Sequence, residues 1–139
     1  MVIGADSIQV AAQAWRQRLG WLLSGSAILF LSLDATAKLL ALPVVVESGA
    51  ALGFPGAGMA RALGTILMVC AILYAAPRTA VLGAILLTGY LGGAVATHVR
   101  AGHPLFSHIL FGVYLGVIVW AGIYLRVPKL RMLIPTLRT

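Results

Sequence analysis

The chain has 139 residues, of which 61% are hydrophobic and only 9% are charged, and its mean hydropathy is +1.03. A chain with this few polar residues cannot cover its surface in water. The composition therefore excludes a soluble globular fold and places the chain in a bilayer. The net charge of +7 comes from basic residues that flank apolar runs, which indicates membrane topology and no nucleic-acid partner. Alternation with period two is missing, which argues against a membrane β-barrel.

Four apolar runs are long enough to cross a hydrocarbon core of about 30 Å as helices, and they cover about residues 19–42, 58–76, 78–99 and 105–125. We therefore expect an all-α integral membrane four-helix bundle in which residues 1–139 form one domain. The first run also has features of a signal peptide, because Arg16 and Arg18 precede it and an A-x-A pattern begins at Ala35. We interpret it as a retained helix. Four spans place both termini on the same side.

The distribution of Lys and Arg predicts which side that is. Seven of the ten basic residues flank the termini and the second connection: Arg16, Arg18, Arg78, Arg126, Lys129, Arg131 and Arg138. The other three lie at the opposite end of the spans: Lys38, Arg61 and Arg100. By the positive-inside rule both termini are expected in the cytoplasm. An aromatic belt at the same interface agrees with this orientation, and it consists of Trp15, Trp21, Trp120 and Tyr124.

The opposite, outer end collects most of the polar residues. The connection PVVVESGAALGFPGAG between the first two spans is too apolar for an ordinary exposed loop, and we expect it to fold back over the mouth of the bundle. Asp34 and Lys38 are spaced i,i+4 on the first span, close enough to pair on one helix face. Asp34 is expected inside the outer leaflet of the bilayer. An ionisable group within a membrane-spanning helix usually faces the bundle interior with a partner and marks a functional site.

All three histidines lie in the stretch GGAVATHVRAGHPLFSHIL at the hairpin between spans three and four. Tyr90 shares a helix face with His98, and His108 begins the next span across the hairpin, so both histidines are expected to point inward. His103 lies in the RAGHP turn and is expected to face solvent. The predicted ligand-binding residues are Asp34, Lys38, Arg61, Tyr90, His98, Arg100 and His108. No metal site is predicted, because no third strong ligand has recognisable spacing.

Each candidate also has a structural interpretation. Asp34 and Lys38 can form an ion pair that only fixes the first span, and Arg61 and Arg100 can extend to the interface. Cys70 is the single cysteine, so no intrachain disulfide or CxxC pair exists, and it is expected to be a small core residue. GxxxG patterns at residues 89–93 and 112–116 are expected to allow close helix packing, within the bundle, in a homodimer or with a partner subunit.

The runs PRTAVLGAILLTGYLGGAVATHVRAGHPLFSH, YLRVPKLRMLIP and DATAKL resemble the DoxX-like family of small bacterial membrane proteins over about residues 20–135. The resemblance implies a four-helix bundle in a bacterial inner membrane. Better-known relatives of that family are subunits of a thiosulfate:quinone oxidoreductase and of a membrane-associated oxidoreductase complex, and an animal receptor-assembly chaperone is more distantly similar. The family therefore implies the fold more firmly than the role, and it supplies no catalytic residues.

The residues and the resemblance together predict a protein that binds a lipophilic ligand such as a quinone at the outer polar pocket, in a redox-accessory role. The chain has no covalent cofactor motif, so an electron carrier would be a bound ligand or a partner. A non-catalytic assembly factor or scaffold is the main alternative, because no complete catalytic constellation is present. A transporter or an enzyme for a small lipophilic molecule, with Asp34 and a histidine as acid and base, is the third class.

Overall fold

A computed structural model describes residues 3–133 of the chain. The elements in chain order are α1 (Ile3–Leu39), α2 (Pro43–Ala51), α3 (Ala57–Ala75), α4 (Ala80–Arg100), the π-helical turn η1 (Leu105–Ile109), α5 (Leu110–Arg126) and α6 (Pro128–Leu133). Four helical segments are long and apolar enough to cross a membrane, namely 7–39, 57–75, 80–100 and 105–126. The predicted all-α four-span architecture is therefore confirmed for the described part of the chain.

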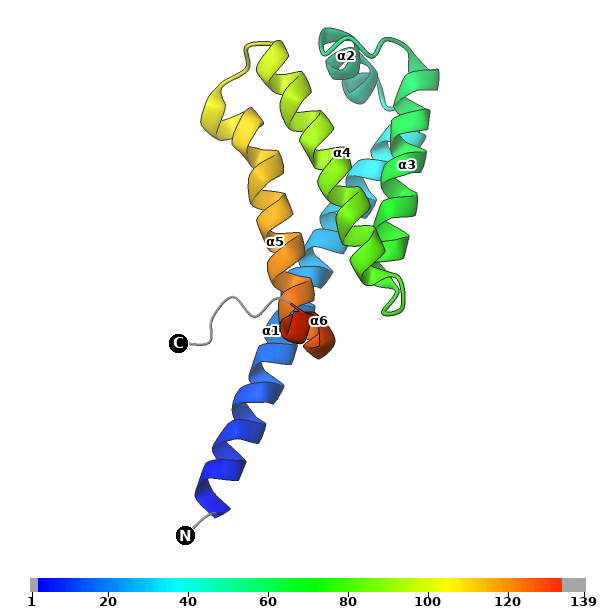
Figure 1. Ribbon diagram of the computed structural model, residues 1–139. Helices are drawn as coiled ribbons and strands as arrows, with labels where there is room; N and C mark the ends of the chain where they lie inside the picture. Colours follow the sequence, from blue (N-terminus) through cyan, green and yellow to red (C-terminus); the bar gives the residue numbers. More distant parts are fainter. Residues whose placement is uncertain (1–2, 134–139) are drawn as a thin grey trace.

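The four long helices pack in chain order around a ring. α1 contacts α3 and α5, and α4 contacts the same two helices, so that α1 and α4 lie across one diagonal of the bundle and α3 and α5 across the other. α2 and the turn before η1 lie at one end of the bundle, and α6 and the α3–α4 connection lie at the other (Figure 1). We call these the α2 end and the α6 end.

The first helix is longer than the sequence predicts. It begins at Ile3 instead of near residue 19, and its first turns extend beyond the α6 end of the bundle (Figure 1). Every side chain from Ser7 to Arg18 is exposed. The apolar run marks the membrane-spanning part, but Ala and Gln continue the helix before it because both residues favour helix formation.

The long connection contains a helix that hydropathy alone does not predict. Pro43 occupies the first turn of α2, a position where its missing N–H costs nothing. α2 contacts α1 and α3, and it covers the α2 end as expected (Figure 1). Gly53 and Gly56 have positive φ angles of 89° and 88°, which glycine adopts without strain and which turn the chain from α2 into α3.

Small residues bring the helices close together. A Cβ atom built on Gly83 would lie 2.2 Å from the backbone nitrogen of Tyr74, so α3 and α4 touch backbone to backbone. Gly64 packs in the same way against Ala35 of α1. The core between the helices consists of buried side chains from α1, α3, α4 and α5, including Leu31, Leu67, Leu87 and Ile123. Without a hydrophobic driving force between helices in lipid, such close packing supplies much of the association energy.

The two GxxxG patterns have different surroundings. Gly112 packs against Leu91 and Val95 of α4 inside the bundle, as predicted for a close helix contact. A Cβ atom on Gly89 or on Gly93 would meet no other atom within 4 Å. The pattern on α4 is therefore not used for packing within the described part of the chain.

A buried polar network joins three helices near the α6 end. The Tyr74 hydroxyl donates to the carbonyl oxygen of Val119 at 2.8 Å. The Ser24 hydroxyl lies 2.9 Å from the Tyr74 hydroxyl oxygen and donates to that oxygen. Tyr74 and Ser24 are fully buried, with 0% of their surface exposed. Gly122 leaves the room for this contact, because a Cβ there would lie 2.6 Å from Ser24 Oγ. The network thus ties α1, α3 and α5 together.

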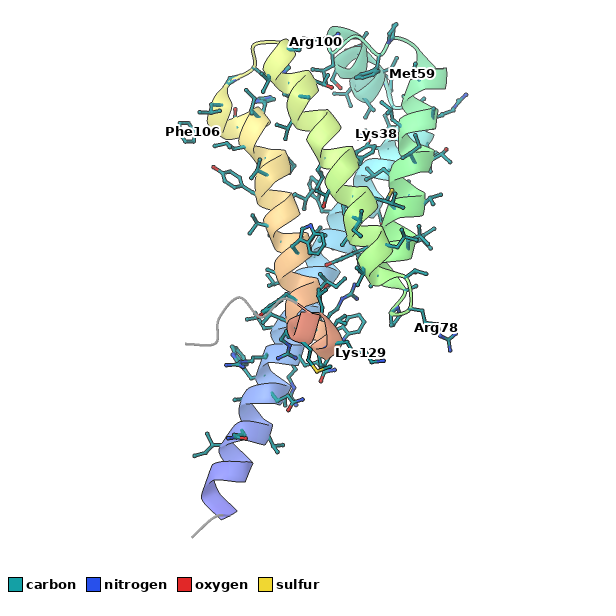
Figure 2. The ribbon with its side chains drawn as sticks, viewed as in Figure 1. Lys38, Met59, Arg78, Arg100, Phe106 and Lys129 are labelled. Carbon is teal, nitrogen blue, oxygen red and sulfur yellow. The ribbon has the colours of Figure 1, made fainter. Side chains whose placement is uncertain are left out.

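Arg126 belongs to the same region and is only 5% exposed, although the sequence groups it with the exposed cations at the interface. Its guanidinium carbon lies 4.7 Å from the ring centroids of both Trp21 and Tyr74, and Nη2 donates to the Tyr74 carbonyl oxygen. Nε and Nη1 are buried without a hydrogen-bond partner among the described residues. Arg78 and Lys129 are exposed at this end (Figure 2). Arg138, which also supports the predicted orientation, lies outside the described residues.

Two alanine variants on α4 test the backbone contact. Gly83→Ala should lower the stability by roughly 1–3 kcal/mol, because the new methyl group must push α3 and α4 apart. Gly89→Ala is the matched control, since it adds the same methyl group to the same helix in open space and should leave stability unchanged or slightly higher. Thermal unfolding in detergent measures both, and equal midpoints for the two variants would contradict the packing described here.

Arg126→Lys tests the stacked guanidinium. Lysine keeps the charge but loses the planar group that stacks between two rings, so we expect a loss of about 1–2 kcal/mol in stability. Lys129→Gln removes an exposed cation at the same end and should change the unfolding midpoint little. The contact would be of no energetic importance if the two variants unfolded at the same temperature in nanodiscs.

Candidate functional site

A cavity of about 530 Å³ lies inside the α2 end of the bundle. Its wall comes from every element at that end, and the lining residues are Phe30, Leu31, Asp34 and Lys38 of α1, Val45, Ser48, Gly49, Leu52 and Phe54 of and after α2, Leu63 of α3, Tyr90, Leu91, Gly93, Ala94, Val95, Thr97 and His98 of α4, His108 of η1, and Phe111, Gly112 and Leu115 of α5. A second depression runs along α1 from Ala14 to Leu22, but one helix face alone forms it, so it has no opposing wall. The cavity is therefore the candidate site.

Asp34 and Lys38 form an ion pair in the cavity wall, as their i,i+4 spacing predicts. The Lys38 side chain is 19% exposed and the Asp34 side chain 36%. Lys38 Nζ donates to one carboxylate oxygen of Asp34, which leaves the other oxygen as an acceptor for a further group. The pair brings no net charge to the cavity, but it does bring a hydrogen-bonding surface to α1.

Tyr90 lies in the wall on α4, half-buried. Among the described residues its hydroxyl has no hydrogen-bond partner, in contrast to the hydroxyl of Tyr74 on the preceding helix. Its ring packs against the core cluster, which fixes its position. Tyr90 thus offers the cavity a positioned hydroxyl that can donate or accept.

The three histidine rings meet in one cluster. Their centroids are 5.0 Å apart for His98 and His103, 5.7 Å for His98 and His108, and 5.2 Å for His103 and His108. His98 Nδ1 and His103 Nδ1 are 2.8 Å apart and share a hydrogen bond. The prediction that His103 faces solvent is wrong: its ring is half-buried against His98, whereas His108 is the exposed member of the cluster.

The chain reversal between α4 and α5 explains how the rings meet. Gly102 has a φ of 69°, a left-handed conformation that ends α4, and the His103 amide donates to the carbonyl oxygen of His98 at 3.1 Å. The chain then enters η1, where the Ile109 amide reaches back five residues to Pro104. Such π-turns are frequent at functional sites, and this one places His108 beside the other two rings.

Two predicted ligand-binding residues do not reach the cavity. Arg61 is exposed in the first turns of α3 and does not line the wall. Arg100 lies at the tip of α4 (Figure 2), where Nη2 donates to the carbonyl oxygen of Leu52 at 2.6 Å. Gly53 makes room for this guanidinium, since a Cβ there would lie 2.6 Å from Nη2. Arg100 therefore fastens the α2–α3 connection to α4 and holds the cavity wall from outside.

Sequence reasoning missed the wall residues that come from non-local packing. Ser48 and Phe54 line the cavity from α2 and its connection, and Phe30 and Phe111 line it from α1 and α5. The rings of Phe30 and Phe111 pack edge to face, with centroids 5.4 Å apart, and both side chains are nearly half exposed. They form the boundary between the cavity and the lipid-facing surface. The apolar character of the connection was the only signal in the sequence for the α2 wall.

The described residues contain no group of three or more His, Cys, Asp or Glu side chains arranged to hold a metal ion. Cys70 is buried in the core, at 5% exposure, away from the cavity wall. The cavity wall presents side chains that can form hydrogen bonds and exchange protons, namely those of Tyr90, the histidine cluster and the Asp34–Lys38 pair.

Comparison with known proteins identifies the family of this fold. The family model of the DoxX-like family matches residues 22–122, which include the whole cavity wall, so the chain belongs to the DoxX-like family. No curated protein and no solved structure matches the chain significantly. The resemblance seen in the sequence is thereby confirmed. The residues of the cavity itself indicate its role.

Proposed function

We propose that this member of the DoxX-like family binds a lipophilic small molecule with a polar head group, such as a quinone, in the cavity at the α2 end. The observation that carries the proposal is the order of polar and apolar residues in the wall. On each of three helices, a polar residue lies two turns nearer to α2 than an apolar one: Lys38 and Leu31 on α1, His98 and Leu91 on α4, and His108 and Leu115 across η1 and α5. This gradient suits a head group near α2 and a tail toward the bundle centre.

Size and access also support a lipophilic ligand. A volume of about 530 Å³ falls in the usual range for small-molecule sites of roughly 300–1,000 Å³. Phe30 and Phe111 line the cavity and are also exposed on the outer surface, so a hydrocarbon tail can pass between α1 and α5 without crossing a polar layer. Quinone carbonyl oxygens accept hydrogen bonds, which the Tyr90 hydroxyl can donate. A redox-accessory role rests on the quinone-linked relatives that the family resemblance implies.

A non-catalytic assembly role is the second candidate, and the glycines of α4 favour it. Gly89 and Gly92 lie outside the cavity wall and have open space where a Cβ would lie, so a helix of a second copy or of another membrane subunit can approach closely. Failure of the cavity to bind any quinone would favour this role.

Tyr90→Phe tests the proposed head-group contact. The change removes only the hydroxyl, so the Kd of decylubiquinone should rise about threefold to tenfold, the effect of a neutral hydrogen bond worth about 0.5–1.5 kcal/mol. Equilibrium binding to the protein in nanodiscs measures this change. Tyr114→Phe is the control, because Tyr114 is exposed on α5 and does not line the cavity. An unchanged Kd for Tyr90→Phe would remove Tyr90 from the site.

A second pair of variants tests the same cavity by shape. Gly93 lines the cavity and Gly92 does not, and both have open space around them. Gly93→Leu should therefore fill the cavity and abolish measurable binding of decylubiquinone, whereas Gly92→Leu should preserve it. Equal binding by the two leucine variants would show that the quinone binds elsewhere.

The orientation that goes with this function has both termini in the cytoplasm of a bacterial inner membrane and the cavity in the outer leaflet. It is supported by the described basic residues, of which six lie toward the α6 end and three toward the α2 end. Green fluorescent protein fused after residue 139 should fluoresce, and alkaline phosphatase fused at the same place should be inactive. An active phosphatase fusion would reverse the orientation and place the cavity in the inner leaflet.

A further inference from the structure

The histidine cluster is placed between water and the cavity. His108 is exposed on η1, and both His98 and His108 line the cavity. His103 lies outside the cavity wall and contacts it through the rings of His98 and His108. A proton that enters at His103 can therefore reach His98, which faces the cavity, through the hydrogen bond between the two rings.

The short contact between His98 and His103 limits how many protons the cluster holds. Two Nδ1 atoms 2.8 Å apart form a hydrogen bond only if one carries a proton and the other is an acceptor. A proton added to Nε2 of the donor ring leaves that bond intact and makes it a stronger, charge-assisted one, whereas the acceptor ring already carries its proton on Nε2. A second added proton would set two N–H groups against each other. The His98–His103 pair thus holds one added proton and resists a second.

Among the described residues, no acidic group that lines the cavity is free to neutralise that charge. The ionisable groups around the cluster are Asp34 and Lys38 on α1, Glu47 on α2, Arg61 on α3, and Tyr90 and Arg100 on α4; the nearest ionisable group on α5 is the exposed Tyr114. Asp34 is the one carboxylate among the lining residues, and Lys38 already pairs with it. Glu47 is exposed on α2 outside the wall. Protonation therefore leaves the cavity with an unpaired cation.

We propose that His98 and His103, with the His108 ring beside them, share one added proton and use its charge to bind an anionic oxygen on the head group of the cavity's ligand. The proposal rests on the proposed function of the cavity and narrows its ligand class from any polar-headed lipophile to one with an ionised oxygen. Binding of the anion takes up one proton from solution, so that the neutral cluster, the anion and the proton form a neutral complex. Affinity then rises as the pH falls through the range of imidazole titration, about pH 5–8.

Two probes with the same tail separate this proposal from the proposed function. Decyl sulfonate carries an oxygen anion at every pH used, whereas decylubiquinone has a neutral head group. We expect the Kd of decyl sulfonate in nanodiscs to fall by up to about tenfold for each unit that the pH is lowered between about 8 and 6, the limit set by uptake of one proton. The Kd of decylubiquinone should not change with pH.

His103→Gln is the decisive variant, because His103 does not line the cavity. We expect it to weaken the binding of decyl sulfonate about tenfold at pH near 6 and to flatten its pH dependence, while decylubiquinone binding stays normal and reports a folded cavity. Arg61→Gln is the control, since it removes a permanent charge from the α2 end at an exposed residue that does not line the cavity. It should change either Kd less than about twofold.

The outcomes distinguish the two proposals. Normal decylubiquinone binding together with pH-independent sulfonate binding would overturn the shared proton and leave the proposed function standing. An equal loss of sulfonate binding in Arg61→Gln and His103→Gln would also overturn it, because a general field of positive charge would then explain the binding of the anion. Loss of sulfonate binding on addition of a chelator would assign the cluster to a metal ion instead. Absence of binding by both probes would overturn both proposals.

Discussion

The structure depends on the rule that a polar group inside a bilayer must find its partner within the protein. Two tyrosines on neighbouring helices meet this rule differently. The Tyr74 hydroxyl is bonded to Ser24 and Val119 in a closed core, and the adjacent guanidinium of Arg126 lies between two aromatic rings. The Tyr90 hydroxyl lies in a cavity wall and has no partner among the described residues. The Tyr74 hydroxyl near the α6 end is thus fully hydrogen-bonded, whereas the Tyr90 hydroxyl in the cavity wall is free to bond a ligand.

The difference between the two ends follows from how closely the helices approach. Near the α6 end Gly122 lets α5 touch α1 at Ser24, so no space remains between them. Toward the α2 end the same two helices present Phe30 and Phe111, whose rings meet edge to face and hold the helices apart. The cavity opens behind these rings and is closed by α2 and by the connection that Arg100 fastens. Close packing at Gly122 thus leaves no space between α1 and α5 near the α6 end, whereas the Phe30 and Phe111 rings border a cavity toward the α2 end. A ligand can bind in that cavity.

The parts of this architecture that the sequence predicts are those governed by neighbouring residues. Hydropathy located four spans because each is a continuous apolar run, and the pairing of Asp34 with Lys38 follows from one turn of helix. The burial of Arg126 was missed because Trp21 and Tyr74, which surround it, come from two other helices. The role of Arg100 was missed for the same reason, since its acceptor, the Leu52 carbonyl oxygen, is a backbone atom of a distant connection. Side-chain type gave no signal for either contact.

The histidines show most clearly where local reasoning stops. His98, His103 and His108 are spaced five residues apart, and on one straight helix successive members would point about 140° away from each other, because each residue turns the helix by about 100°. They meet only because the chain reverses at Gly102 and then adds a π-turn before α5 begins. A regular α-helical start at Leu105 would change the register of His108 relative to the other two rings. The wider turn is therefore a structural requirement of the cluster, because it places His108 of η1 beside His98 of α4 in the cavity wall.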